Sequence, residues 1–281
     1  MTTSPEAITE SSHPLPTGAP ALAARPQPTW LTAVRVHAGR LLRRWSRSSP
    51  MIVSTVGLPI TMVVVVNVMF DGMVRQFTGQ GMNPAHVAVM VAVSMAFTGS
   101  ILGAGGTVQE RQEGLPDRLA TMPGHTSASL AGRVVAESLR ALITAIASLG
   151  VGFAYGADFG GITGFTWTVL ILLLVACAAG TVGVLLGYTV DTPQGALSLS
   201  PLIMAAMFFS TAVMPREMYA PGVRPLVSIS PITAVTQVVS DAHNKVSNVG
   251  HLLAFLAWFG GMVILASLVL ARVARRRTLD S

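Results

Sequence analysis

This sequence carries little charge: aspartate, glutamate, lysine and arginine make up 11% of its 281 residues, against about 25% in an ordinary soluble domain. Because 51% of the residues are hydrophobic, the chain is predicted to be an all-α integral membrane protein. A helical span needs about 20 largely apolar residues. The uncharged runs predict six spans, at about residues 51–70, 85–106, 133–156, 165–188, 196–215 and 251–272.

Cysteine and lysine each occur once, as Cys177 and Lys245. A single cysteine excludes an internal disulfide and a thiolate metal cluster. A P-loop ATPase needs a glycine-rich loop that ends in a lysine at the phosphates, and Lys245 lies in HNKVSN instead. The motifs GxSxG, HExxH and CxxC are missing, and the histidines have no ligand-like pairing. The sequence therefore predicts no catalytic residue, metal site or cofactor, so that any driving ATP and Mg must be bound by a separate subunit.

Basic residues cluster beside the predicted spans. Because such residues are retained on the cytoplasmic side of span ends, both termini are predicted to be cytoplasmic, an arrangement that places fourteen of the eighteen basic residues inside. The net charge of +6 thus reflects topology, and no nucleic-acid partner is predicted. Residues 1–28 hold six prolines and are predicted to be a disordered cytoplasmic tail, which leaves 29–281 as the transmembrane domain.

Two segments are predicted to lie along the membrane surface. Within residues 30–47, four arginines share one helix face and apolar residues gather on the opposite face, which predicts an amphipathic helix on the bilayer. The alternative is a merely basic flank before the first span. Residues 216–250 are semi-polar and punctuated by prolines, and they are predicted to form short helices that dip into the outer leaflet.

Charges inside the spans are rare, and Glu137 and Arg140 in the third predicted span are the main ones. Ion-coupled transporters usually keep Asp, Glu or His within their spans, so the sequence does not favour ion coupling. At a spacing of three residues, the two side chains are predicted to pair with each other near the cytoplasmic interface. The alternative is a role in transmitting motion from the charged loop that precedes this span.

Small residues at a spacing that permits close helix contacts occur at Gly99 and Gly103 and at Gly183 and Gly187. They are predicted to be packing surfaces, and the sequence does not identify their partners.

The charged run at residues 109–123, QERQEGLPDRLATMP, lies between the second and third predicted spans. Leu115, Leu119 and Met122 follow an i, i+4, i+7 stripe with Asp117 on the opposite side, and Pro116 suits a first helical turn. The spacing predicts a short amphipathic helix that presents a docking face. The alternative is an ordinary solvated loop.

This run and the residues after it resemble the pattern GxxDRxxxMP, followed eight residues later by GRxxA, in ABC-2 type permeases, particularly the Drr-like daunorubicin-resistance exporters of actinobacteria. The resemblance extends more loosely from about residue 30 to residue 277. Pro116 departs from the plain helix former of many members, which affects the start of the short helix. The matching positions are Gly114, Asp117, Arg118, Met122, Pro123, Gly132, Arg133 and Ala136.

The resemblance implies a permease of the cell membrane in which two copies, or two related permeases, pair with two cytoplasmic P-loop ATPase subunits. It implies export of a hydrophobic cargo, an amphipathic drug or a lipid, because the EAA-type loop of importers is missing; a polymer exporter is a variant within the same family. The short helix would dock on the ATPase. The docking residues implied are Glu110, Arg111, Glu113, Gly114, Leu115, Asp117, Arg118 and Leu119.

For a cargo path, the sequence offers Asn67, Ser94 and Thr98 in the first two spans and Met204 and Phe208 in the fifth. Methionine suits adaptable surfaces, although such residues more often face lipid or the core. Two functions of other classes stay open from the residues alone. One is a membrane channel or scaffold that works without an ATPase. The other is a membrane-embedded enzyme, which needs polar residues that converge at one depth, and the sequence shows none.

Overall fold

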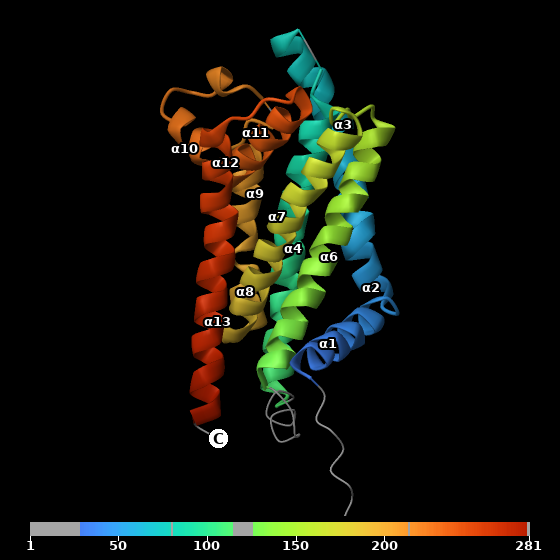
Figure 1. Ribbon diagram of the computed structural model, residues 1–281. Coiled ribbons are helices and arrows are strands. Elements are labelled where there is room, and N and C mark those ends of the chain that lie inside the picture. Colours follow the sequence, from blue (N-terminus) through green and yellow to red (C-terminus); the bar gives the residue numbers. More distant parts are fainter. Residues whose placement is uncertain (1–28, 80, 115–125, 213, 280–281) are drawn as a thin grey trace, which may run out of the picture.

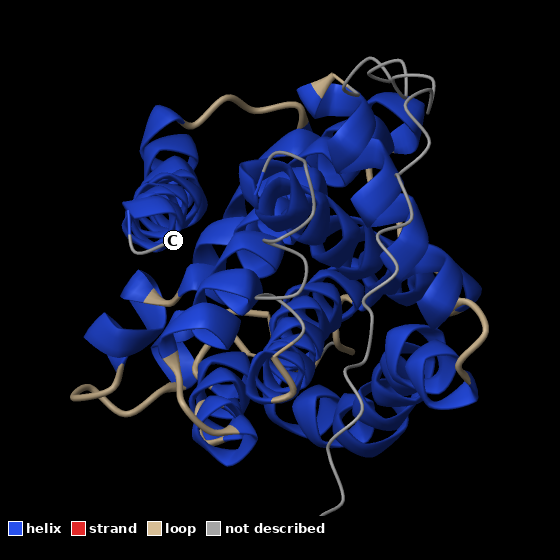
Figure 2. Ribbon diagram, turned by 90° about the horizontal axis from the view of Figure 1, so that it is seen from below, coloured by secondary structure: helices blue, strands red, loops and turns tan. Residues whose placement is uncertain are grey.

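The computed structural model describes residues 29–79, 81–114, 126–212 and 214–279, and no strand occurs in those ranges. Helices joined by short connections make up the structure (Figure 2). The longer helices are α1 (Trp30–Trp45), α3 (Leu58–Thr78), α4 (Pro84–Gln112), α6 (Thr126–Ala154), α7 (Gly161–Thr189), α11 (Pro231–Asn244) and α13 (Gly261–Leu279). The shorter elements are α2 (Ser49–Ile52), α8 (Pro193–Leu197), α9 (Ser200–Phe208), α10 (Arg224–Ile229), α12 (Val249–Phe255), the π-helical turns η1 (Val53–Gly57) and η3 (Leu256–Gly260), and the 3-10 turn η2 (Arg216–Met218).

Five helices of the described chain are long and apolar enough to cross a membrane, and they overlap five of the six predicted spans. The remaining prediction, residues 196–215, corresponds to the shorter apolar helix Pro193–Phe208, which is interrupted between α8 and α9. The count of six spans is therefore not confirmed by helix length. The five long helices cover Ser49–Phe77, Pro84–Gln112, Ser127–Ala154, Gly161–Thr189 and Val249–Val273.

The interruption has a local cause. Pro201 lies in the first turn of α9, where the missing proline N–H costs least, so a new helix starts there. The helix ends at Phe208, and the Tyr219 hydroxyl then donates to the carbonyls of Phe208 (2.9 Å) and Ser210 (2.8 Å). A side chain thus replaces helical hydrogen bonds well before residue 215. In Figure 1, α8 and α9 follow one another along the bundle beside α7 and α13.

Helix α4 is the axis of the bundle, because it packs against α3, α6, α7 and α9 and most of its residues are buried. Gly183 and Gly187 of α7 allow a close approach: a Cβ added at these positions would lie 2.8 Å from the Ser100 Cβ and 2.6 Å from the Thr107 Cβ of α4. The predicted packing role of these glycines is confirmed, and α4 is their partner. The C-terminal helix α13 stands at the edge of the bundle (Figure 2).

Helix α1 crosses one end of the bundle, which we call the α1 end; the C-terminal end of α13 lies there too (Figure 1). The Thr29 hydroxyl accepts from the Thr32 N–H and caps the helix. Val34 and Ala38 are buried, and α1 packs on α6. Partial burial, with Arg40 nearby, lowers the pKa of His37. The predicted helix is therefore present, with Val34 and Ala38 buried and Leu31 of the same apolar face exposed. Its place on the bilayer stays a prediction.

The opposite end of the bundle carries η2, α10, α11 and α12 (Figure 1). The short helices predicted within residues 216–250 are thus confirmed, and Ile232, Val235 and Val239 of α11 are buried against the bundle. A bond of 2.8 Å between His251 Nδ1 and Asp241 Oδ2 ties α12 to α11. The depth of these helices in the outer leaflet stays a prediction.

Candidate functional site

Glu110, near the C-terminal end of α4, holds three helices together at the α1 end. Its carboxylate accepts from the guanidinium of Arg44 in α1 at 2.9 Å and from that of Arg133 in α6 at 2.5 Å. The Arg133 side chain is 13% exposed and the Arg44 side chain 69% exposed. The bond to Arg133 is therefore the stronger of the two, because water screens it less.

The two residues after Glu110 bind the C-terminal end of α7. Arg111 Nη1 donates to the carbonyls of Gly187 (3.0 Å) and Val190 (3.1 Å), and Gln112 Nε2 donates to the Asp191 carbonyl (3.0 Å). These carbonyls lie at the end of α7, where the last turn of a helix lacks intrahelical donors. Consecutive side chains of α4 thus brace α1 and α6 on one side and the end of α7 on the other.

The bracing bears directly on the predicted ATPase-docking residues. Glu110 and Arg111 point to neighbouring helices of the same chain, whereas Glu113 is exposed and accepts from Gln109 at 3.3 Å. Gly114 ends the described segment with a φ of +71°, a value that favours glycine. The predicted short helix and its docking residues Leu115, Asp117, Arg118 and Leu119 lie outside the described residues. Docking therefore stays a prediction.

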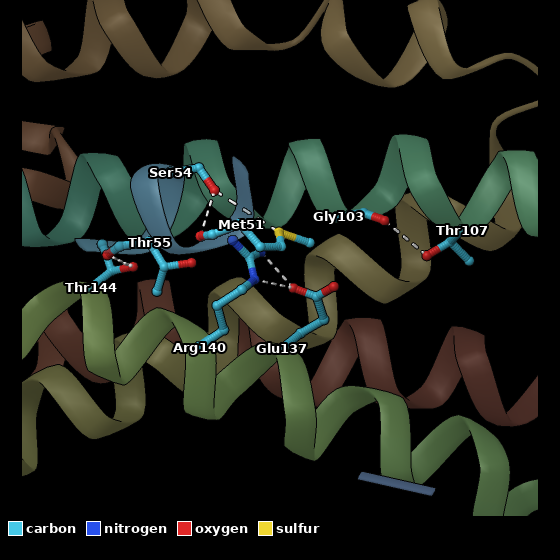
Figure 3. A network of polar contacts seen from close by, with 8 residues as sticks. All are labelled: Met51, Ser54, Thr55, Gly103, Thr107, Glu137, Arg140 and Thr144. Carbon is cyan, nitrogen blue, oxygen red and sulfur yellow. Dashed lines mark hydrogen bonds and ion pairs between the residues drawn. The ribbon is translucent and has the colours of Figure 1, made fainter. Parts of the chain in front are cut away.

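Higher along α6, Glu137 and Arg140 form a buried ion pair, as predicted from their spacing. The Arg140 Nη2 and Glu137 Oε2 atoms are 2.5 Å apart, and the two side chains are 5% and 3% exposed. The Arg140 guanidinium also lies over the Trp45 ring of α1, 5.7 Å from its centroid, a cation–π contact. Figure 3 shows the pair reaching from α6 toward Met51, at the start of the first long helix. The pair thus lies between α6 and the junction that leads from α1 into that helix.

The glycines of α4 make room for this pair. A Cβ added at Gly99 would lie 2.6 Å from Arg140 Nη1, and one at Gly103 would collide with Glu137 Oε1. Real Cβ contacts are longer, so any larger residue at these positions forces a shift. The close-contact surface predicted at Gly99 and Gly103 is confirmed, and its partner is the ion pair of α6.

Four polar residues of α6 lie on one face of the helix, because their spacing from the first is four, seven and eleven residues. The last of them, Thr144, donates from its hydroxyl to the Thr55 carbonyl in η1 at 3.0 Å (Figure 3). Sequence reasoning missed Thr144, although the polar stripe on this helix was a readable signal, and it did not connect Trp45 with Arg140. The stripe consists of Arg133, Glu137, Arg140 and Thr144.

The predicted cargo residues fall into two groups. Asn67 and Thr98 donate to carbonyls of their own helices, those of Val63 and Ser94, each at 2.8 Å, and Ser94 is itself buried. Met204 and Phe208 are exposed on α9, and the Phe208 ring lies 6.3 Å from that of Phe70 in α3. Their role as a cargo path stays a prediction. Within the described ranges, no group of three or more His, Cys, Asp or Glu residues is placed to hold a metal ion.

The chain is similar to known proteins along most of its length. The sequence profile of the family described as ABC-2 type transporter matches residues 32–243, from α1 into α11. The chain is 29% identical over 245 residues to the probable doxorubicin resistance ABC transporter permease protein DrrC of Mycobacterium tuberculosis, a match that covers 86% of this chain and 87% of that protein. It is 25% identical over 247 residues to the daunorubicin resistance ABC transporter permease protein DrrB1 of Streptomyces coeruleorubidus, with 83% of each chain covered.

Proposed function

This chain belongs to the ABC-2 type transporter family, and on that premise we propose that it is the permease subunit of an ABC exporter that moves an amphipathic drug or a lipid out of the cell. It is a multi-pass protein of the plasma membrane. The observation that carries the proposal is the family match, which runs through the braced α1 end and over four of the five long apolar helices.

The partner is a cytoplasmic P-loop ATPase, because a permease of an ABC transporter acts with an ATPase subunit. That subunit would bind ATP and Mg, so the permease itself needs no nucleotide site and no catalytic residue. We place the docking surface on the segment that follows Gln112, with Glu113, Gly114 and the charged residues after them in contact. Glu110 and Arg111 contribute indirectly, because their bonds to α1, α6 and α7 fix the C-terminal end of α4, which directly precedes this segment in the chain.

We further propose six crossings with both termini in the cytoplasm. In this arrangement, α8 and α9 together make the fifth crossing as a broken helix, which is tolerated in a membrane where neighbouring elements satisfy the freed backbone groups. The bonds from Tyr219 to the Phe208 and Ser210 carbonyls are of that kind. The uneven distribution of basic residues along the chain supports the orientation.

The cargo and the second permease are inferred from chemistry. The two relatives are named for resistance to doxorubicin and to daunorubicin, which supports a drug as cargo. Large apolar side chains, including Val68, Met69 and Phe77 of α3, are exposed in the single chain. Lipid and a second permease, either an identical copy or a related subunit, would cover such surfaces.

Co-purification from the native host tests the proposal. The tagged chain, extracted in mild detergent, should bring down a stoichiometric P-loop ATPase, and membrane vesicles that hold the complex should take up doxorubicin when ATP is added. Arg118→Glu should release the ATPase, whereas Arg216→Glu, at an exposed arginine of the opposite end, should not. If no ATPase is found under several detergents, the channel or scaffold alternative replaces the exporter.

A further inference from the structure

The α-helical pattern of the first long helix is interrupted where proline removes a donor. In an α-helix, the Thr55 carbonyl would accept from the N–H four residues later, but that residue is Pro59, which has none. The chain forms the π-helical turn η1, Val53–Gly57, just before the proline. Such turns inside a helix are often found at functional sites. A proline and a π-helical turn are the usual causes of a kink in a helix, and we call this place the bend. The Thr55 carbonyl lacks there the donor that a regular α-helix would give it.

Thr144 of α6 supplies that donor. Its hydroxyl lies 3.0 Å from the Thr55 carbonyl oxygen, and Thr144 and Thr55 are 2% and 8% exposed. Because the bilayer interior offers no water to a freed carbonyl, a bond from a neighbouring helix is the means of satisfying it. The two side chains lie against each other in Figure 3. The bond fixes one point of α6 to the bend between η1 and α3.

The same face of α6 leads back to the α1 end. Arg133 bonds Glu110 close to the predicted docking segment, Arg140 packs on Trp45 at the end of α1, and Thr144 holds the bend. These three contacts follow one another along α6. Arg133 reaches α4, whereas Arg140 and Thr144 reach the stretch that runs from α1 into α3. A shift of α6 along its axis therefore bears on the bend directly, without an intervening flexible segment.

We propose that Thr144 is a positioning residue for transport: its hydroxyl passes the movement of α6 to the bend in the first long helix. This inference rests on the proposed function, since it takes ATPase closure as the source of that movement. It assigns no contact with cargo to Thr144. The consequence is that loss of the hydroxyl uncouples ATP hydrolysis from transport while both the fold and the ATPase contact persist.

The test compares variants of the permease in the reconstituted complex, with doxorubicin moved per ATP hydrolysed as the readout. Thr144→Val keeps the shape and removes the donor, and Thr144→Ser keeps the donor. An interhelical bond of this kind in a membrane is weak to moderate, so we expect the ratio to fall about three- to tenfold in Thr144→Val and to recover in Thr144→Ser. The matched control is Thr168→Val, because Thr168 is equally buried but donates to the Gly164 carbonyl of its own helix at 2.9 Å.

A second site gives an independent check. Pro59→Ala restores an N–H at the position from which an α-helix would serve the Thr55 carbonyl, so the need for Thr144 should disappear. The double variant Pro59→Ala/Thr144→Val should therefore lose less coupling, relative to Pro59→Ala, than Thr144→Val loses relative to the unmodified chain. This comparison also decides the matter if Thr144→Val alone does not fold, since a folded and coupled double variant supports the inference and a failed rescue contradicts it.

Hydrogen exchange of the amides at residues 56–58 and 60–62, with and without vanadate-trapped nucleotide, separates this inference from the proposed function. If the unmodified complex moves no doxorubicin, the cargo proposal fails, yet nucleotide-dependent exchange at the bend still reports the coupling. We expect that dependence in the unmodified chain and in Thr168→Val, and its loss in Thr144→Val. Equal behaviour of Thr144→Val and Thr168→Val in both assays overturns the inference.

Discussion

Removing one charge of the pair Glu137–Arg140 should harm the protein more than removing both. In Glu137→Gln, the Arg140 guanidinium stays buried and charged, because arginine does not lose its proton in proteins. The glutamine amide oxygen can still accept a hydrogen bond from it and the Trp45 ring still lies beside it, but no negative charge remains to neutralise it. A Cβ at Gly99 would lie only 2.6 Å from Nη1, so the guanidinium has little room to reach water. In Arg140→Met, no buried cation is left, and an apolar side chain of similar length fills the space of the guanidinium.

The structure sets the expected order and size of the effects. Breaking a buried ion pair by removing one partner costs about 3–5 kcal/mol, and the exposures of 5% and 3% put Arg140 and Glu137 in that class. We therefore expect Glu137→Gln to be the most destabilising, with Arg140→Met intermediate. The double variant, with a neutral and roughly isosteric pair, should lie within about 1 kcal/mol of the unmodified protein.

Thermal unfolding of the purified protein in detergent, followed by intrinsic fluorescence, measures the difference. A loss of this size lowers the midpoint by on the order of 10 °C. Asp71→Asn is the control, because Asp71 and Arg75 pair at 2.9 Å with side chains 34% and 65% exposed, and exposed pairs contribute less than about 1 kcal/mol. The reasoning about the buried pair is wrong if Glu137→Gln and Asp71→Asn unfold at the same temperature, or if the double variant is as unstable as Glu137→Gln.

Further predictions concern the neighbouring contacts. Gly103→Ala should destabilise the protein by about 1–3 kcal/mol through overlap with the buried carboxylate, whereas Gly106→Ala, with open space around it, should be neutral or slightly stabilising in the same melting assay. Glu110→Gln should speed hydrogen exchange in α1 several-fold because α1 and α6 lose their shared partner, and Glu113→Gln should leave it unchanged; equal rates in both would contradict the bracing role. Because burial lowers the pKa of His37 below the ordinary 6.5, the folded state favours neutral imidazole: the contribution of His37 to docking of α1 is complete above pH 6.5 and is lost as the pH falls through its lowered pKa. His37→Gln should remove that part of the pH dependence of exchange in α1, and an unchanged profile would refute it.

Much of the fold was predictable because the bilayer imposes simple rules on composition and length. Five of the six predicted spans coincide with long helices, and the pairing of Glu137 with Arg140 followed from their spacing on one helix. The remaining predicted span, residues 196–215, extends beyond the end of α9 at Phe208, because apolar composition does not reveal where a helix stops. The Phe208 end depends on a hydroxyl from Tyr219, eleven residues further on.

The candidate site was only partly predictable, for a related reason. The sequence indicated Glu110 and Arg111 as docking residues but did not indicate the helices that they bind. Their partners, Arg44, Arg133 and the end of α7, are distant in the chain. Contacts to backbone carbonyls, such as that from Thr144 to Thr55, leave no trace in residue type at the accepting position. Only the absence of a donor at Pro59 gave a hint.

The central place of α4 also has a consequence for biogenesis. Most of its faces are covered by α6 and α7, which are synthesised after it. During translation this glycine- and serine-containing helix must wait for its partners, beside lipid or the insertion machinery, before the buried interfaces can close. The packing of α4 against α6 and α7 can therefore close only after α7 has been made, and the later elements α9, α11 and η3 then add their buried residues to the same core. The helix with the most buried residues thus depends on segments that are made after it, and not on those that precede it alone.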